Sequence, residues 1–253
     1  DTLIIGTSGR YEFKNKGIDV FLESLNRLNR DKDLKKKVLA FVNVPSWVGD
    51  PREDLQKRLK SKDKFTEPLQ CPFITHWLHN MTHDQVLDML KYLGMGNRPE
   101  DKVKVIFVPC YQDGHDGILN KHYYDLILGE DLSVYPSYYE PWGYTPLESV
   151  AFRVPTITTD LAGFGLWVNS LKNQHGINDG VEVLHRSDYN YSEVADGIKD
   201  TVALFSTKTE AEIKEIRKRA GQVAEQALWK HFIQYYYEAY DIALRNAMKR
   251  QLK

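Results

Sequence analysis

Short apolar runs alternate along this chain with stretches in which apolar residues recur every three or four positions. The runs predict strands at 3–8, 38–44, 73–78, 103–108, 132–135 and 154–159. Helical spacing predicts helices from residue 18, over 53–60, after 82 and over 119–128. Strand, helix and strand follow one another at least four times, which predicts an α/β fold with a Rossmann-like, doubly wound parallel sheet.

The last quarter of the chain reads as C-terminal helices. Thr209 and Glu212 predict a capping box at the start of one of them. The final helix carries an aromatic stripe at helical spacing, formed by Trp229, Phe232, Tyr236, Tyr240 and Leu244. Such a stripe packs by default in a core, against either the sheet or a partner domain. We therefore divide the chain into a Rossmann-like domain over 1–228 and a C-terminal helix over 229–253.

The stretch 138–150 reads as a loop that turns into a helix. Thr145 stands where an N-cap would lie, Pro146 suits the first helical position, and Glu148 follows the cap by three residues. Glu140 lies on the loop before them. Carboxylates on either side of a helix N-terminus could bind sugar hydroxyls while free N–H groups meet phosphate, which suggests a nucleotide-sugar site. A capping box beside a solvated loop glutamate remains the alternative.

Two cations lie between the first predicted strand and its helix. Arg10 could grip diphosphate oxygens with a bidentate fork, and Lys16 could act as a point charge. The alternative is that both are ordinary surface or carbonyl-binding side chains. Arg10, Tyr111, Glu140 and the loop glycine Gly163 each follow a predicted strand, so we expect them to share the carboxyl edge of the sheet.

Composition and charge limit the classes of partner that we expect for this chain. The chain has 253 residues, is 42% hydrophobic and 27% charged, and carries a net charge of −1, values typical of a globular protein. This balance predicts no nucleic-acid partner and no membrane association. Two cysteines in no paired spacing favour a reducing, cytoplasmic location. Because the chain begins at Asp1, without a signal peptide, we expect a piece of a longer protein.

The sequence lacks the motifs of several other classes of binding site and enzyme. The chain has no Gly-x-Gly-x-x-Gly after a predicted strand, no P-loop and no Gly-x-Ser-x-Gly elbow. His76, His79 and His83 could form a metal patch, but a cap predicted at Thr82 separates them. No nearby carboxylate or cysteine completes a ligand set in the sequence. We therefore expect no metal.

Three segments are specific enough to suggest a family. Residues 8–17 read Ser-Gly-Arg-Tyr-Glu-Phe-Lys-Asn-Lys-Gly, 138–148 read Tyr-Tyr-Glu-Pro-Trp-Gly-Tyr-Thr-Pro-Leu-Glu, and 158–165 read Thr-Thr-Asp-Leu-Ala-Gly-Phe-Gly. In this order they resemble the glycogen synthases of animals and fungi, which are retaining glucosyltransferases. The resemblance implies the C-terminal, donor-binding half of a GT-B fold.

The resemblance also implies a role for each matching position. Arg10 and Lys16 would neutralise the diphosphate of UDP-glucose, and Glu140 would bind the glucose hydroxyls. Tyr123 would stack near the uracil, and Tyr111 would line the same pocket. Thr145 would contact phosphate, Glu148 would bind ribose, and Gly163 would border the donor site. No cofactor or metal is required, because the donor substrate is UDP-glucose and the two cations supply the positive charge.

The resemblance also bears on the whole enzyme. The acceptor, glycogen or another α-1,4-glucan, would bind through an N-terminal domain outside this chain, to which the last helix would cross back. The stripe from Trp229 to Leu244 would then be partly exposed in this chain, as a patch for intra-chain docking. The resemblance also implies that the full-length enzyme is a homo-oligomer. The cluster Arg217, Lys218 and Arg219 is sparse beside the arginine run of the regulated enzymes, so the sequence leaves allosteric activation open. A non-catalytic glucan- or protein-binding module, or a transferase for another nucleotide-sugar, remains an alternative.

Overall fold

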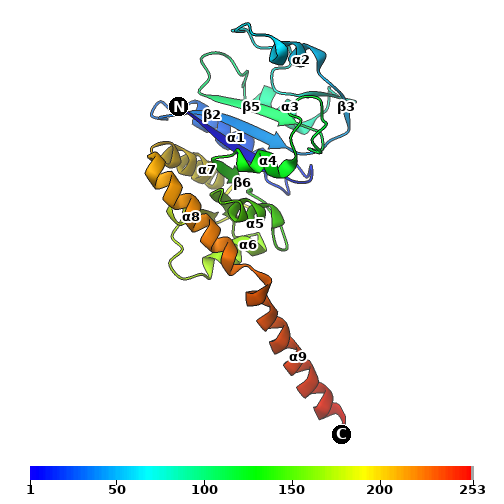
Figure 1. Cartoon of the computed structure of the whole chain (residues 1–253), viewed down its shortest axis with the longest axis vertical. Helices are drawn as coiled ribbons and strands as arrows, with labels where there is room; N and C mark the ends of the chain where they lie inside the picture. Colours follow the sequence, from blue (N-terminus) through cyan, green and yellow to red (C-terminus); the bar gives the residue numbers. More distant parts are fainter. Residues whose placement is uncertain (252–253) are drawn as a thin grey trace.

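A six-stranded parallel sheet organises the structure, a computed structural model that describes residues 1–251 (Figure 1). Its strands are β1 (Thr2–Ser8), β2 (Lys37–Asn43), β5 (Val103–Val108), β6 (Leu132–Val134), β7 (Thr156–Thr159) and β8 (Val181–Leu184). Their order is β5-β2-β1-β6-β7-β8, and every neighbouring pair is parallel. This confirms the predicted fold class. The sequence had not predicted β8.

The strand order reverses between β1 and β6. Right-handed crossovers therefore place the helices of the two halves on opposite faces. One face carries α1 (Ile18–Asn29), α3 (Gln85–Tyr92) and α7 (Tyr191–Ser206); the other carries α4 (Tyr123–Leu128), α5 (Tyr144–Ala151), α6 (Gly163–Asn169) and α8 (Glu210–Gln226). Ligands of such sheets bind at the carboxyl ends of the strands beside this reversal.

The central strands are fully buried on one face of the sheet. Ile5, Ala40 and Val105 are register partners in three adjacent strands and are fully buried, whereas most of the alternate residues of β2 and β5 are only partly buried. From α1, Phe21 and Leu22 pack into the same core. The site is therefore built on a rigid sheet, and the polar residues that follow each strand are held at fixed positions along one edge.

A small antiparallel sheet extends the domain beyond β5. It pairs β3 (Val48–Pro51) with β4 (His76–Leu78), and α2 (Glu53–Lys60) follows β3. The sequence predicted α2 and a strand near β4, but it missed β3 because prolines and a glycine interrupt that segment. A 3₁₀ helix over Ile177–Asp179 precedes β8.

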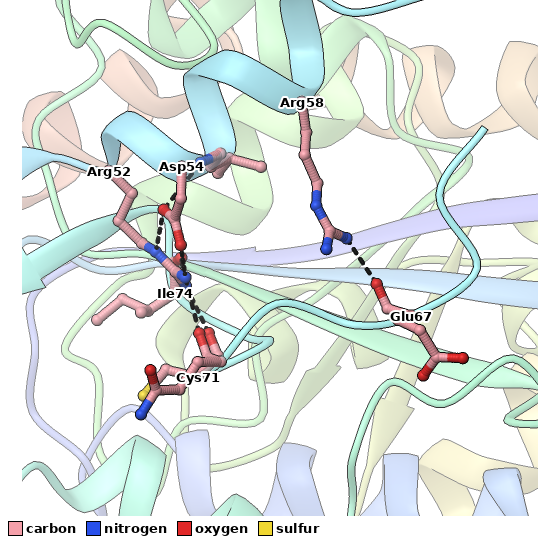
Figure 2. A network of polar contacts seen from close by, with 8 residues as sticks. Arg52, Asp54, Arg58, Glu67, Cys71 and Ile74 are labelled. Atoms are coloured by element: carbon pink, nitrogen blue, oxygen red, sulfur yellow. Dashed lines mark hydrogen bonds and ion pairs between the residues drawn. The ribbon is translucent and has the colours of Figure 1, made fainter. Parts of the chain in front are cut away.

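Buried Arg52 holds this small sheet to the loop that follows α2 (Figure 2). Its guanidinium donates to the backbone carbonyls of Gln70, Cys71 and Ile74 and to the carboxylate of Asp54. Its guanidinium carbon also lies 4.6 Å from the ring centre of Trp77. One side chain thus supplies hydrogen bonds that a loop without regular structure cannot make for itself.

Two predicted helix starts outside the candidate site were wrong. The N-cap of α3 is Asp84, whose carboxylate accepts from the backbone N–H of Leu87 at 3.0 Å, and not Thr82. Helix α4 begins at Tyr123 and not near 119, because Asp116 accepts backbone N–H groups from residues 118, 119 and 120 and holds them in a turn. Local side-chain hydrogen bonds compete with helix formation at such positions.

The capping box of α8 is confirmed. The Thr209 hydroxyl accepts from the Glu212 N–H, and the Glu212 carboxylate accepts from the Thr209 N–H. We expect Thr209→Ala to lower the free energy of unfolding by about 1 kcal/mol, because one helix N–H loses its partner. Chemical denaturation measures this loss, and Thr207→Ala serves as an exposed control. Equal stability of the two variants would contradict the prediction.

The final helix, α9 (Trp229–Gln251), extends away from the sheet (Figure 1). The default expectation that its stripe is core was wrong for four of the five members, and the partial exposure that the resemblance implied is confirmed. Trp229, Tyr236, Tyr240 and Leu244 are 48% to 59% exposed. Phe232 is the exception, because its ring packs edge-on against Trp142 and Trp167 of the domain, both at 5.5 Å. No helix within residues 1–251 has the length and apolar character of a membrane span.

Candidate functional site

A pocket of about 780 Å³ opens at the carboxyl edge of the sheet, beside the reversal of strand order. It lies between the loops that follow β1, β2 and β5 and the helices α4 and α5. Five residues selected from the sequence line it: Arg10, Tyr111, Tyr123, Thr145 and Glu148. Its volume falls in the range of small-molecule and cofactor sites.

Arg10 stands at the mouth of the pocket, directly after β1. Its side chain is 76% exposed, and Nη1 lies 3.0 Å from Oε1 of Glu12. An exposed ion pair of this kind is weak, so the guanidinium can exchange Glu12 for another anion at little energetic expense. Tyr111, at the opposite loop, is also largely exposed.

Lys16 and Glu140 form an ion pair between two loops 124 residues apart in sequence. Their side chains are only 14% and 19% exposed. The Lys16 Cε lies 4.0 Å from the point that a Cβ on Gly9 would occupy, and Gly9 lines the pocket. Neither charged residue lines the pocket itself. The pair therefore lies behind the pocket wall at Gly9, and its cation is partly buried whereas Arg10 is exposed.

Glycine geometry brings the Lys16 loop and the Glu140 loop together. Gly17 has a φ of 68°, and a Cβ there would lie 2.0 Å from the Pro136 carbonyl oxygen. The Tyr138 N–H donates to the Asn15 carbonyl at 2.8 Å. Only glycine permits this backbone approach, which sets the distance between the loops that carry the two charges.

Helix α5 begins earlier than the sequence predicted. Its N-cap is Gly143, with a φ of 111°, and the helix starts at Tyr144. Thr145 is thus inside the first turn and not the cap, and no side chain caps this end. Pro146 is tolerated at the third position because the N–H it lacks has no partner within the helix. The Thr145 side chain is left to line the pocket.

Glu148 lies on the pocket-facing side of α5 and makes no capping box. Its carboxylate accepts from the Tyr124 hydroxyl at 3.3 Å. Burial raises the pKa of Glu148 above its usual range, although the tyrosine hydrogen bond opposes the shift. A half-desolvated carboxylate in a pocket is a candidate acceptor for hydroxyl groups.

A chain of hydroxyl groups that the sequence did not reveal fixes Tyr123. Its hydroxyl lies 2.9 Å from Ser8 Oγ, which lies 3.4 Å from the Tyr135 hydroxyl. Tyr135 in turn contacts Ser149 at 2.8 Å. Burial raises the pKa of both tyrosines. Single serines and tyrosines at strand ends give no periodic signal, so only the structure shows that they share a network.

Gly163 contacts the backbone of the Glu140 loop and does not line the pocket. The predicted loop at 163–165 is instead the first turn of α6. The Gly163 N–H donates to the Glu140 carbonyl at 3.0 Å, and a Cβ at Gly163 would lie 2.2 Å from the Pro141 carbonyl oxygen. Gly163 does not line the pocket, but it places the start of α6 against the Glu140 loop.

Glu130 is a buried carboxyl behind the site. Its Oε2 accepts from Ser133 Oγ at 2.6 Å, and a Cβ at Gly6 would lie 2.0 Å from its Oε1. Burial raises the pKa of Glu130 to about 8 from an ordinary value near 4.5. The folded protein therefore holds a proton that the unfolded chain releases.

This proton predicts a pH dependence of stability. Between about pH 4.5 and 8 the unfolded chain binds fewer protons at Glu130, so the free energy of unfolding should fall as pH rises, by at most about 1.4 kcal/mol per pH unit. Glu130→Gln should remove this slope, whereas exposed Glu225→Gln should keep it. Denaturation at several pH values tests this, and an unchanged slope in Glu130→Gln would contradict it.

The sequence analysis considered a patch of His76, His79 and His83 and did not favour it, and the structure groups His76 with other residues. Within residues 1–251, His76 lies with Cys110 and Asp116, whose potential ligand atoms are within 4.8 Å of one another. The sequence did not predict this trio. Both ring nitrogens of His76 already have partners, Thr75 Oγ1 at 2.9 Å and the Asp116 carbonyl at 2.7 Å. Burial also raises the pKa of the Cys110 thiol to about 11, which favours a packing role. The absence of a metal stays a prediction.

Comparisons with known proteins agree on one family. The family model described as glycogen synthase matches residues 1–50 and 53–253. A glycogen [starch] synthase of Neurospora crassa is 28% identical over 303 residues, covering 98% of this chain and 42% of that protein. A glycogen [starch] synthase of Caenorhabditis elegans is 32% identical over 237 residues, covering 73% of this chain and 35% of that protein. The chain thus spans less than half the length of these relatives.

A solved structure supports the fold. The pneumococcal O-GlcNAc transferase GtfA, determined with UDP and GlcNAc, has a TM-score of 0.51 and 14% identity to this chain. The match covers 96% of this chain and 36% of that one. At this identity the likeness concerns the fold alone, and the GT-B architecture expected from the sequence is confirmed.

Proposed function

Because the chain belongs to the glycogen synthase family, we propose that it is the donor-binding half of an enzyme that transfers glucose from UDP-glucose to an α-1,4-glucan. Transfer takes place at the non-reducing end of the glucan and retains the anomeric configuration. The chain alone binds nucleotide and turns nothing over, because the acceptor binds to a part of such enzymes that this chain does not span.

One observation supports this proposal above the others. A pocket of nucleotide size lies at the reversal of strand order; exposed Arg10 lines it on the β1 side, and partly buried Lys16 lies behind that wall. A purely structural module would not need Arg10, Lys16, Glu140 and Glu148 in one region. The geometry therefore favours the enzyme over the binding module.

The proposed chemistry is stabilisation of charge. When the bond between glucosyl C1 and the diphosphate breaks, negative charge grows on the leaving UDP. Arg10 and Lys16 meet that charge, together with the N–H groups at the start of α5. Because Lys16 is already held by Glu140, little reorganisation is needed at the moment of reaction.

The remaining residues orient the donor. Glu140 accepts hydrogen bonds from the glucose hydroxyls, Tyr123 stacks near the uracil, and Tyr111 closes the opposite wall. Thr145 contacts phosphate, and the half-buried Glu148 binds ribose hydroxyls. Gly163 acts indirectly, by placing the Glu140 loop.

Further features of the proposal concern the whole enzyme. No metal is needed, since the two cations balance the diphosphate. The exposed stripe of α9 docks on the acceptor domain, which agrees with its large exposed aromatic surface. A homo-oligomer and a cytoplasmic location remain predictions from the sequence.

Nucleotide binding tests the proposal directly. We expect the chain to bind UDP in calorimetric titrations and to prefer it to ADP. Arg10→Ala should weaken UDP binding about 10- to 100-fold, as expected for loss of a charged hydrogen bond. Arg30→Ala, on the far end of α1, is the control and should bind UDP normally. If the wild-type chain binds neither nucleotide, the donor-site assignment is wrong for this chain. A preference for ADP would instead indicate a transferase for another nucleotide-sugar.

A further inference from the structure

A buried arginine that the proposed chemistry does not use lies behind the Glu140 loop. Arg186 follows β8 and is 6% exposed. Its Nη1 donates to the Pro136 carbonyl, and its guanidinium carbon lies 5.4 Å from the ring centre of Tyr138. We propose that Arg186 is a positioning residue for glucosyl transfer, which fixes Glu140 and, through it, Lys16. This inference rests on the proposed function and adds a residue that supports its charged pair.

The segment 136–138, which leads to Glu140, is anchored at each of its residues. The first carbonyl accepts from Arg186, the second accepts from Thr159 Oγ1 at 2.6 Å, and the last N–H donates to the Asn15 carbonyl at 2.8 Å. Of these three anchors Arg186 brings the charge, and a charged donor makes the stronger hydrogen bond. Loss of the guanidinium therefore frees the start of the segment.

The same guanidinium meets the loop that precedes α1 and carries Lys16. A Cβ on Gly17 would lie 2.7 Å from Arg186 Nη1 and 2.0 Å from the Pro136 carbonyl oxygen, so the three groups converge. Asp19 follows in the first turn of α1. Burial raises the pKa of the Asp19 carboxyl and lowers the pKa of the Arg186 guanidinium, and each charge opposes the shift of the other. Arg186 thus joins the start of α1 to the neighbouring loop.

The end of the sheet holds Arg186 itself in place. Its backbone N–H donates at 2.9 Å to Oδ1 of Asp160, which directly follows the neighbouring strand β7. The next N–H, that of Ser187, donates to Asn190 Oδ1 at 2.7 Å. The guanidinium therefore reaches both loops from a fixed point at the edge of the sheet. A side chain supported in this way can set the distance between two other groups without contacting the ligand.

The position of the Lys16–Glu140 pair matters because transfer needs both groups at fixed distances from the donor. The pair joins two loops 124 residues apart in sequence, so its geometry depends on what holds those loops together. A misplacement of about 1 Å can lower a rate about 100-fold, even when the altered residue is remote from the reacting atoms. Arg186 does not line the pocket. Its loss should therefore affect the rate of transfer far more than the affinity for UDP.

The competing explanation is that Arg186 serves stability alone. In that case its loss lowers the amount of folded enzyme, and the rate falls by the same factor whichever residue stands at position 140. A double-mutant cycle with Glu140 separates the two explanations, because residues that act as a unit are not additive.

The measurement is kcat for glucose transfer from UDP-glucose to glycogen by a full-length enzyme that contains this chain. Arg186→Met should lower kcat about 10- to 100-fold. Its affinity for UDP, measured by calorimetry, should stay within about threefold of the wild type. In a Glu140→Gln background, Arg186→Met should lower kcat by less than about threefold, because the group that it positions is already altered.

Two further variants complete the test. Arg52→Met removes another buried arginine from backbone carbonyls outside the site, and the folded enzyme should keep kcat within about twofold. Arg186→Lys keeps the charge, which protects the fold if the methionine variant does not fold. It removes the planar fork, so kcat should fall about threefold to tenfold beside Glu140 and remain unchanged in the Glu140→Gln background.

Equal losses of kcat in the two backgrounds would show that Arg186 only stabilises the fold, and the inference would be overturned. It would also be overturned if UDP affinity fell as much as kcat, since the pocket itself would then be distorted. A kcat of Arg186→Met within about threefold of the wild type would overturn it while the donor site stands. If the wild-type enzyme transfers no glucose from UDP-glucose, the proposed function itself fails.

Discussion

Replacement of Lys16 by methionine is expected to lower the rate of glucosyl transfer about 10²- to 10³-fold in a full-length enzyme that contains this chain. Lys16 is the less exposed of the two cations and is held in place by Glu140 before any ligand arrives. Its removal withdraws positive charge from the leaving diphosphate and leaves a half-buried carboxylate without its partner. The measurement is the initial rate of glucose incorporation into glycogen from UDP-glucose.

Lys14→Met provides the matched control, because Lys14 lies on the same loop and is exposed. It should leave the rate within about twofold, since the charge of an exposed lysine is screened by water. A rate for Lys16→Met within tenfold of the wild type would show that Lys16 does not stabilise the departing charge. Equal losses in both variants would point to the net charge of the loop instead.

Arg52→Met is expected to lower the free energy of unfolding by about 3 kcal/mol, the largest stability effect that we predict. The substitution leaves the carbonyls of Gln70, Cys71 and Ile74 without their donor in a buried site. It also removes the guanidinium from the ring of Trp77. Urea denaturation measures the difference.

Arg58→Met is the matched control for this prediction (Figure 2). Arg58 donates to a single carbonyl, that of Glu67, and stacks on Phe65, which is 49% exposed. Its loss should therefore be less than about 1 kcal/mol. Similar losses for the two arginines would show that burial of Arg52 adds nothing to stability.

The fold was largely predictable because its signals are local. Strands β2 and β5 are nearly continuous apolar runs, and α1 shows apolar residues at helical spacing, so their packing in the core follows from the local pattern. Helix ends were less predictable. Thr82 and Asp84 are both good caps, and only the tertiary packing of α3, where Asp84 also accepts from Tyr11, decides between them.

Part of the site was predictable, because residues that follow parallel strands lie at the same edge of the sheet. Arg10 and Tyr111 follow strands directly, and the structure places both on the pocket. Ser8 ends a strand and Arg186 follows one, but isolated polar residues are common there and carry no distinguishing pattern. Their importance rests on the hydrogen bonds that they make, and those involve residues at least 50 positions away.

The sequence by itself determined the alternation of strands and helices, the doubly wound sheet and the edge at which a ligand binds, because each depends on periodicity within one segment. Tertiary structure alone decided the pairing of Lys16 with Glu140, the burial of Arg52 and which ring of the α9 stripe packs against the domain. The physical reason is the same in all three. Whether a charge is paired or an aromatic ring is covered depends on which distant segments the fold brings near. The local sequence pattern does not specify those segments.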